Sequence, residues 1–196
     1  MRTHLKSVCL VVFLFAVTLS PAAAATVWTD RNADGLPDSG IQNVPAGTIV
    51  TLQVWIDSGS FVWTNYLVYV EHASGAFTKR NAGYTIDGAN FPIDYFSHPR
   101  GFGLGGWGYN NLSGITQIGW MQFKFLGSSA INGKCVSPII NPADSYGVFC
   151  QLGTSSTYSL FETASNSCFK SATGGGAKNY SASQSSSWGR VKSLFR

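Results

Sequence analysis

The chain alternates between apolar and polar residues over several short segments. The clearest segment is TIVTLQVWID, Thr48–Asp57, in which every second residue is apolar. Alternation with a period of two is typical of a β-strand with one buried face. The expected buried face carries Val50, Leu52, Val54 and Ile56, and the expected outer face carries Thr51, Gln53, Trp55 and Asp57.

The same pattern predicts strands over Asn65–Glu71 and Ile118–Phe125, with shorter candidates at Tyr146–Leu152 and Tyr158–Glu162. In Ile118–Phe125, one face carries Met121, Phe123 and Phe125, and the other carries Trp120, Gln122 and Lys124. The body shows no amphipathic helix, and Gly, Pro and Ser turns separate the strands. These features favour an all-β antiparallel sandwich of two sheets.

The first 25 residues have the pattern of a secretory signal peptide. A basic start is followed by the apolar run Val8–Leu19 and by the small residues Ala22–Ala25. The apolar run is too short to span a membrane, and small residues suit a cleavage site. We therefore expect a secreted protein, outside the cell or at its surface, with no transmembrane segment after residues 1–25 are removed.

The remaining chain divides by composition into three parts. Residues 26–170 contain all the predicted strands and form the expected sandwich domain. Residues 171–187, SATGGGAKNYSASQSSS, are small and polar, which is typical of a flexible linker. Residues 188–196, WGRVKSLFR, form a basic and aromatic ending that we expect either to attach the protein to a surface or to act as a plain tail.

Composition and charge support a secreted β domain and argue against nucleic-acid binding. Charged residues make up 11% of the chain and aromatic residues 14%, a composition suited to β-strands. Of thirteen basic residues, Arg2 and Lys6 lie in the predicted signal peptide, and three more lie after Gly189. The body therefore has eight basic and nine acidic residues, so it lacks the basic surface that nucleic acid requires.

Three cysteines follow the predicted signal peptide: Cys135, Cys150 and Cys168. An exported compartment allows disulfides. We expect one structural bridge and one remaining thiol, and the spacing leaves all three pairings open.

The segment DRNADGLPD, residues 30–38, matches the first nine positions of a calcium-loop pattern. Calcium takes about six to eight oxygen ligands, which alternating acidic and amide side chains can supply. The predicted calcium ligands are Asp30, Asn32, Asp34, the carbonyl of Leu36, and Asp38. The pattern argues against a switching EF-hand, because the twelfth position would be Ile41 and a predicted strand follows in place of a helix. The remaining ligands would be backbone, water or a distant acid such as Asp57 or Asp144. The alternative is a turn in which these side chains bind their own backbone.

The segment GFGLGG, Gly101–Gly106, fits G-x-G-x-x-G, but the strand and helix of a dinucleotide site do not flank it. We expect an irregular loop or bulge here. Phe102, Trp107 and Tyr109 are candidates for an exposed aromatic surface that binds sugar rings, with packing in the core as the alternative.

The sequence contains little that could support catalysis. His72 and His98 are the two histidines after the signal peptide, and we expect both at the surface or in turns. No G-x-S-x-G or H-E-x-x-H motif occurs, and no spacing pairs two carboxylates as a glycoside hydrolase requires. We therefore expect no enzymatic activity, with a glycan hydrolase as the distant alternative.

Residues 44–77, VPAGTIVTLQVWIDSGSFVWTNYLVYVEHASGAF, together with IGWMQFKFLG at 118–127, resemble cohesin-like domains. The resemblance implies a jelly-roll sandwich related to carbohydrate-binding modules, and a role in protein–protein adhesion or carbohydrate attachment. The segment 30–38 alone is similar to the calcium loops of dockerins and thrombospondin type 3 repeats, which implies an ion and no dockerin function. We expect a calcium-stabilised adhesion module that binds an extracellular protein, or alternatively a polysaccharide.

Overall fold

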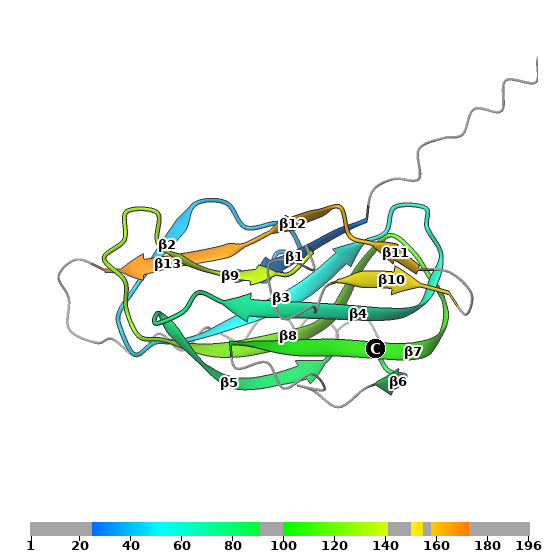
Figure 1. The fold of residues 1–196 in the computed structure, drawn as a ribbon, viewed down its shortest axis with the longest axis horizontal. Helices are drawn as coiled ribbons and strands as arrows, with labels where there is room; N and C mark the ends of the chain where they lie inside the picture. Colours follow the sequence, from blue (N-terminus) through cyan, green and yellow to red (C-terminus); the bar gives the residue numbers. More distant parts are fainter. Residues whose placement is uncertain (1–24, 91–99, 141–149, 155–157, 173–196) are drawn as a thin grey trace, which may run out of the picture.

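The structure is a computed structural model, and it describes residues 25–90, 100–140, 150–154 and 158–172. These residues form two β-sheets and contain no helix (Figure 1). The five-stranded sheet has the order β12 (Thr163–Ser165), β1 (Thr26–Asp30), β3 (Ile49–Asp57), β8 (Ile115–Phe125) and β5 (Phe77–Tyr84). We refer to it as sheet A.

The second sheet, sheet B, has eight strands. Its main path is β11 (Tyr158–Leu160), β10 (Gln151–Gly153), β4 (Trp63–His72), β9 (Lys134–Pro138), β13 (Ser167–Ser171) and β2 (Ile41–Val44). On the other side of β4 lies β7 (Gly101–Leu112), which also pairs with β6 (Ala89–Asn90). Within the residues that the structure describes, there is no helix with the length and apolar character needed to span a membrane.

The two sheets enclose one hydrophobic core, to which both contribute. Every second residue of β3 from Val50 to Ile56 is buried, and so are Met121, Phe123 and Phe125 of β8. Phenylalanine rings join the sheets: Phe77 of β5 lies 5.8 Å from Phe169 of β13, and Phe102 of β7 lies 5.5 Å from Phe123, measured between ring centroids. The predicted all-β jelly-roll sandwich is therefore confirmed, as are the buried faces of its two longest predicted strands.

Two strand pairs depart from the predicted antiparallel arrangement. β1 pairs with β12 in parallel, and β13 pairs with β2 in parallel. Both pairs bring late strands beside the first two described strands, and β12 and β2 are the edge strands of these pairs (Figure 1).

The prediction of an irregular loop at Gly101–Gly106 is wrong, since these residues begin the twelve-residue strand β7. Its glycines permit close packing: a Cβ at Gly101 would lie 2.2 Å from the carbonyl oxygen of Val70 on β4. A Cβ at Gly103 would lie 3.2 Å from the Tyr69 ring. Glycine here provides room for a neighbouring strand and ring instead of breaking the strand.

Some predictions fall outside the described residues. These are residues 1–24 of the predicted signal peptide, most of the Tyr146–Leu152 strand, His98, Asp144, and the linker and ending from residue 173 onward. The shorter candidate Tyr158–Glu162 corresponds to β11, which ends at Leu160.

Candidate functional site

The loop that follows β1, residues 30–38, is closed by its own hydrogen bonds. We call it the aspartate loop. The Asp30 carboxylate accepts three backbone N–H groups at 2.8–3.0 Å, those of Asn32, Ala33 and Gly35. Asp34 accepts the backbone N–H of Leu36 and the Asn32 side-chain amide, each at 2.8 Å. Such bonds are typical of turns in which acidic side chains bind nearby backbone groups, which is the alternative interpretation of this segment.

Among the predicted calcium ligands, Asp38 bonds to Arg31 of the same loop and not to the backbone around Asp30 and Asp34. Its Oδ2 accepts the backbone N–H of Arg31 at 3.1 Å and lies 3.6 Å from the Arg31 guanidinium. Across residues 25–90, 100–140, 150–154 and 158–172, no three His, Cys, Asp or Glu side chains are grouped to hold a metal ion. Asp30, Asn32 and Asp34 supply the oxygen donors that suit calcium, and calcium binding stays a prediction.

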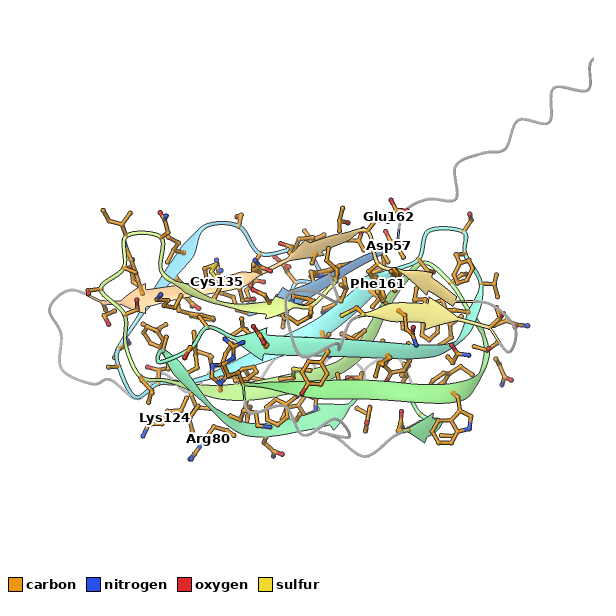
Figure 2. All side chains as sticks on the ribbon, viewed as in Figure 1. Asp57, Arg80, Lys124, Cys135, Phe161 and Glu162 are labelled. Carbon is orange, nitrogen blue, oxygen red and sulfur yellow. A yellow bond between two sulfur atoms is a disulfide. The ribbon has the colours of Figure 1, made fainter. Side chains whose placement is uncertain are left out.

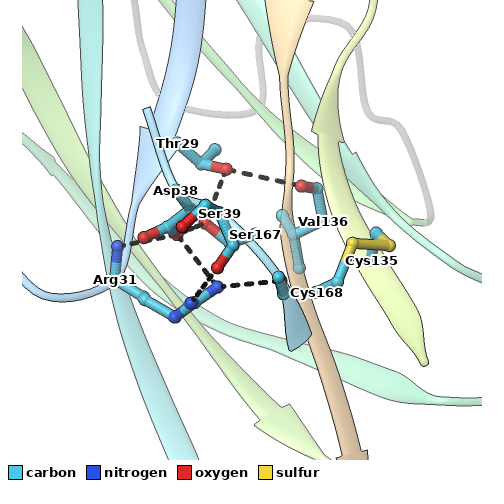
Figure 3. The surroundings of a disulfide bond; sticks show 9 residues. Thr29, Arg31, Asp38, Ser39, Cys135, Val136, Ser167 and Cys168 are labelled. Atoms are coloured by element: carbon cyan, nitrogen blue, oxygen red, sulfur yellow. Dashed lines mark hydrogen bonds and ion pairs between the residues drawn. A yellow bond between two sulfur atoms is a disulfide. The ribbon is translucent and has the colours of Figure 1, made fainter. Parts of the chain in front are cut away.

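Asp38 instead connects the aspartate loop to β13. The Ser167 hydroxyl donates to Asp38 and also shares a hydrogen bond of 2.8 Å with Thr29 of β1 (Figure 3). Burial raises the pKa of Asp38 above its ordinary value, while the Ser167 bond and the Arg31 charge act in the opposite direction. The side chain therefore serves as a structural fastening between the start and the end of the domain.

The disulfide lies immediately beside this fastening. β9 and β13 pair antiparallel with Cys135 directly opposite Cys168, and these two cysteines form the bridge. Cys150 is a free, buried thiol whose sulfur accepts the Tyr69 backbone N–H at 3.3 Å. Burial raises the pKa of the Cys150 thiol far above its ordinary value. The expectation of one bridge and one thiol is confirmed, and the structure selects the pair.

The predicted aromatic surface is not formed as a set of three rings. Phe102 and Tyr109 are only 5% and 7% exposed. The Tyr109 ring packs against Trp63 at 6.0 Å, and its hydroxyl donates to Asn90 at 2.6 Å. Trp107 is 47% exposed, because its position in β7 faces away from the core. The interpretation of Phe102 and Tyr109 as sugar-binding rings is therefore wrong, and packing in the core accounts for both.

A different pair of tryptophans lies on the outer face of sheet A. Trp55 of β3 and Trp120 of β8 are both partly exposed, and Gln53 pairs directly with Trp120 in the sheet. The outer faces of the two predicted strands already carried these residues among polar neighbours. This position on the polar face was the signal in the sequence that could have revealed an exposed aromatic surface, because a tryptophan there is not needed for the core.

His72 and Glu71, two polar residues that a catalytic site could use, have structural partners. His72 is buried, contrary to the predicted surface position, and its ring packs 5.6 Å from Phe123. Burial lowers the pKa of His72, so the ring is held neutral in the core. Beside the disulfide, the described residues lining a shallow hollow include one carboxylate, Glu71, which is paired with Arg100 at 3.1 Å.

Comparison with solved structures identifies this arrangement of sheets. No protein-family model and no curated protein matches the sequence. A cohesin module from a Clostridium perfringens family 33 glycoside hydrolase is similar, with a TM-score of 0.54 and 10% identity, over 76% of this chain and 98% of that one. The sixth cohesin of Acetivibrio cellulolyticus scaffoldin B, solved with a dockerin, has a TM-score of 0.52 and 13% identity, over 76% and 99%.

A third similar structure is the seventh type I cohesin of a Pseudobacteroides cellulosolvens scaffoldin. It has a TM-score of 0.52 and 12% identity, over 80% of this chain and 97% of that one. At 10–13% sequence identity, these similarities support a shared fold and nothing beyond it. The chain has a cohesin-like fold, as its sequence predicts.

Proposed function

We propose that this chain is a non-catalytic module that binds a protein partner outside the cell. The observation that carries the proposal is the cohesin-like sandwich, which matches 97–99% of the length of three solved cohesin modules. One of those modules was solved in complex with a dockerin. The position of His72 in the core and the pairing of Glu71 with Arg100 support a binding role over a catalytic one.

The partner is proposed to dock around Trp107 on the outer face of sheet B. Trp107 lies opposite Asn65 of β4 and Ala89 of β6 in the sheet, and nearly half of its surface is exposed. The amide of Asn65 is held by a hydrogen bond of 2.9 Å to the Thr154 carbonyl, so the surroundings of the indole are ordered. Exposed tryptophan on a rigid strand is a common anchor of protein–protein interfaces.

Secretion and attachment belong to the same proposal. The predicted signal peptide directs the chain out of the cell, and the Cys135–Cys168 bridge suits an oxidising compartment. The ending WGRVKSLFR is proposed to attach the module to a surface through its linker. Calcium is proposed to add to the hydrogen bonds that already close the aspartate loop.

The experiment is a pull-down of native secreted and surface proteins with the secreted chain, with and without calcium. The test compares the wild-type chain with Trp107→Ala and with Trp120→Ala, whose tryptophan lies on the opposite sheet. We expect a protein partner whose affinity falls about tenfold or more in Trp107→Ala and is unchanged in Trp120→Ala. Recovery of no specific protein by the wild-type chain would overturn the proposal.

A further inference from the structure

The outer face of sheet A carries a second surface with the features of a ligand site. We call it the tryptophan face, and it comprises Trp55 and Gln53 of β3, Trp120 and Gln122 of β8, and Asn81 of β5. Strand pairing brings these residues together, because Gln53 and Gly83 flank Trp120, while Thr51 and Asn81 flank Gln122. Side chains of three adjacent strands therefore form one continuous surface.

The Trp120 ring lies against the β5 backbone at Gly83. A Cβ built on Gly83 would be 2.6 Å from Nε1 and 2.7 Å from Cζ2 of the indole, so the ring covers the space that a side chain would need. Glycine at position 83 allows one ring face to rest on the β5 backbone. The Trp120 side chain is partly exposed.

The Trp55 ring is also fixed in orientation. It stacks on Trp28 of β1 with a centroid distance of 6.4 Å and an interplanar angle of 6°. Its indole N–H donates to Gln53 at 3.0 Å, and a Cβ at Gly35 of the aspartate loop would lie 3.6 Å from the ring. The aspartate loop thus helps to hold one of the two partly exposed tryptophans.

Uncharged hydrogen-bonding groups surround the rings. The Gln122 amide donates to the Thr51 hydroxyl at 3.1 Å, and Asn81 accepts the Ala82 backbone N–H at 3.0 Å. Flat aromatic rings beside fixed amides are suited to pyranose sugars, whose C–H faces pack on a ring while their hydroxyls bond to amides.

Two positively charged side chains near the rings further restrict the chemical class of the ligand. Lys124 lies on the same face of β8 as Trp120, roughly 13 Å farther along the strand. Arg80 of β5 lies beside it, and Figure 2 shows the two cations together, at the end opposite Asp57 and Glu162. Within the described residues neither cation has an ion-pair partner.

We propose that the tryptophan face binds an acidic polysaccharide built from uronic acids. One pyranose ring packs on Trp120, and hydroxyls of that sugar bond to Gln53 and Gln122. A carboxylate farther along the polymer pairs with Lys124 and Arg80, whose arrangement allows charge-assisted hydrogen bonds. This site is separate from the proposed protein interface, because Trp107 belongs to sheet B and Trp120 to sheet A.

The test measures binding of the secreted chain to polygalacturonate, alginate and hyaluronate by calorimetry. Methyl-esterified polygalacturonate supplies the sugar without charge, and polyglutamate supplies charge without sugar. We expect binding to at least one of the three acidic glycans, and about tenfold weaker binding or none to the ester and to polyglutamate.

Variants then test the geometry of the face. Trp120→Ala and Gly83→Ala are expected to reduce affinity about tenfold or more, the second by displacing the ring while tryptophan is retained. Lys124→Gln is expected to weaken binding and reduce its salt dependence. Trp107→Ala and Lys134→Gln are matched controls on sheet B, and both should bind as the wild type does.

Melting curves establish that each variant is folded before its affinity is compared. The proposal would be overturned if no acidic glycan bound, or if a folded Trp120→Ala variant bound with wild-type affinity. Equal binding of polyglutamate would also overturn it, because charge alone would then explain the result.

Discussion

The Ser167 hydroxyl donates a hydrogen bond to the Asp38 carboxylate, joining residues that are 129 positions apart in the sequence. Ser167 immediately precedes Cys168, and Thr29 links the same hydroxyl to β1. The fastening and the disulfide therefore act at one place, where the aspartate loop meets the last strand of the domain (Figure 3). Such a contact constrains a long stretch of chain, and its loss should affect the whole sandwich.

Asp38 should give the free energy of unfolding a distinctive pH dependence. Burial raises the pKa of Asp38 in the folded state above its ordinary value of 3.8, so the folded state holds this proton more tightly than the unfolded state. The contribution of Asp38 to stability therefore falls as the pH rises from its ordinary pKa through the raised one. Asp38→Asn, which is uncharged at every pH, should remove that component in urea unfolding measured from about pH 3 to about pH 7.

Asp34→Asn is the matched control for this measurement, because Asp34 is exposed on the same loop. Parallel pH profiles for the wild type and Asp38→Asn would contradict the prediction.

The Cys135–Cys168 bridge should contribute much of the stability of this domain. It joins residues 33 positions apart, and closing a loop of that length in the unfolded chain is worth about 3–4 kcal/mol. The double variant Cys135→Ala/Cys168→Ala should lose about that free energy of unfolding in denaturant titrations. Cys150→Ala, which retains the bridge, should still be destabilised by reductant, whereas the double variant should not respond. A double variant as stable as the wild type would refute this.

Alternation in the sequence predicted the central strands well because each has one face in a single core. For β3 and β8, which pair along most of their length, burial follows the period of two expected for a strand. The same alternation placed Trp55 and Trp120 outward. It contains no information on the register of β5, so the position of Trp120 over Gly83 could not be foreseen.

Other elements were missed for identifiable physical reasons. Strand β7 contains five glycines in twelve residues, so its local propensity opposes the strand that packing against β4 produces. Strands β9 and β13 have five residues each and meet only through distant pairing, which is what brings Cys135 opposite Cys168. Contacts between distant strands, and not the local sequence pattern, determine that these segments form strands.

Calcium should raise the melting temperature of the secreted chain. Asp30, Asn32 and Asp34 offer oxygen donors in one loop, and a bound ion stabilises the folded state by mass action. Asp34→Ala should abolish the shift while changing the calcium-free melting temperature little, because Asp34 is exposed. Asp87→Ala, an exposed carboxylate after β5, should retain the shift. Identical melting curves with calcium and with chelator would rule out the ion.

Gly101 should be among the least replaceable glycines of the sandwich. Any side chain there points at the β4 backbone, since a Cβ would lie 2.2 Å from the Val70 carbonyl oxygen and 3.0 Å from the Glu71 Cα. Neither atom can move unless β4 and β7 separate, and that pairing supports much of sheet B. Gly101→Ala should therefore lower the free energy of unfolding by about 3 kcal/mol or more in urea titrations.

The control is Gly108→Ala in the same strand. Gly108 has φ of +78° and no atom within 4 Å of the added Cβ, so alanine there bears only the cost of the left-handed conformation. That cost is about 1–2 kcal/mol. A larger loss for Gly101→Ala than for Gly108→Ala would show that close approach of two strands, and not backbone conformation, requires glycine in β7. Equal losses would mean that β4 and β7 can part at this point without disturbing the sandwich.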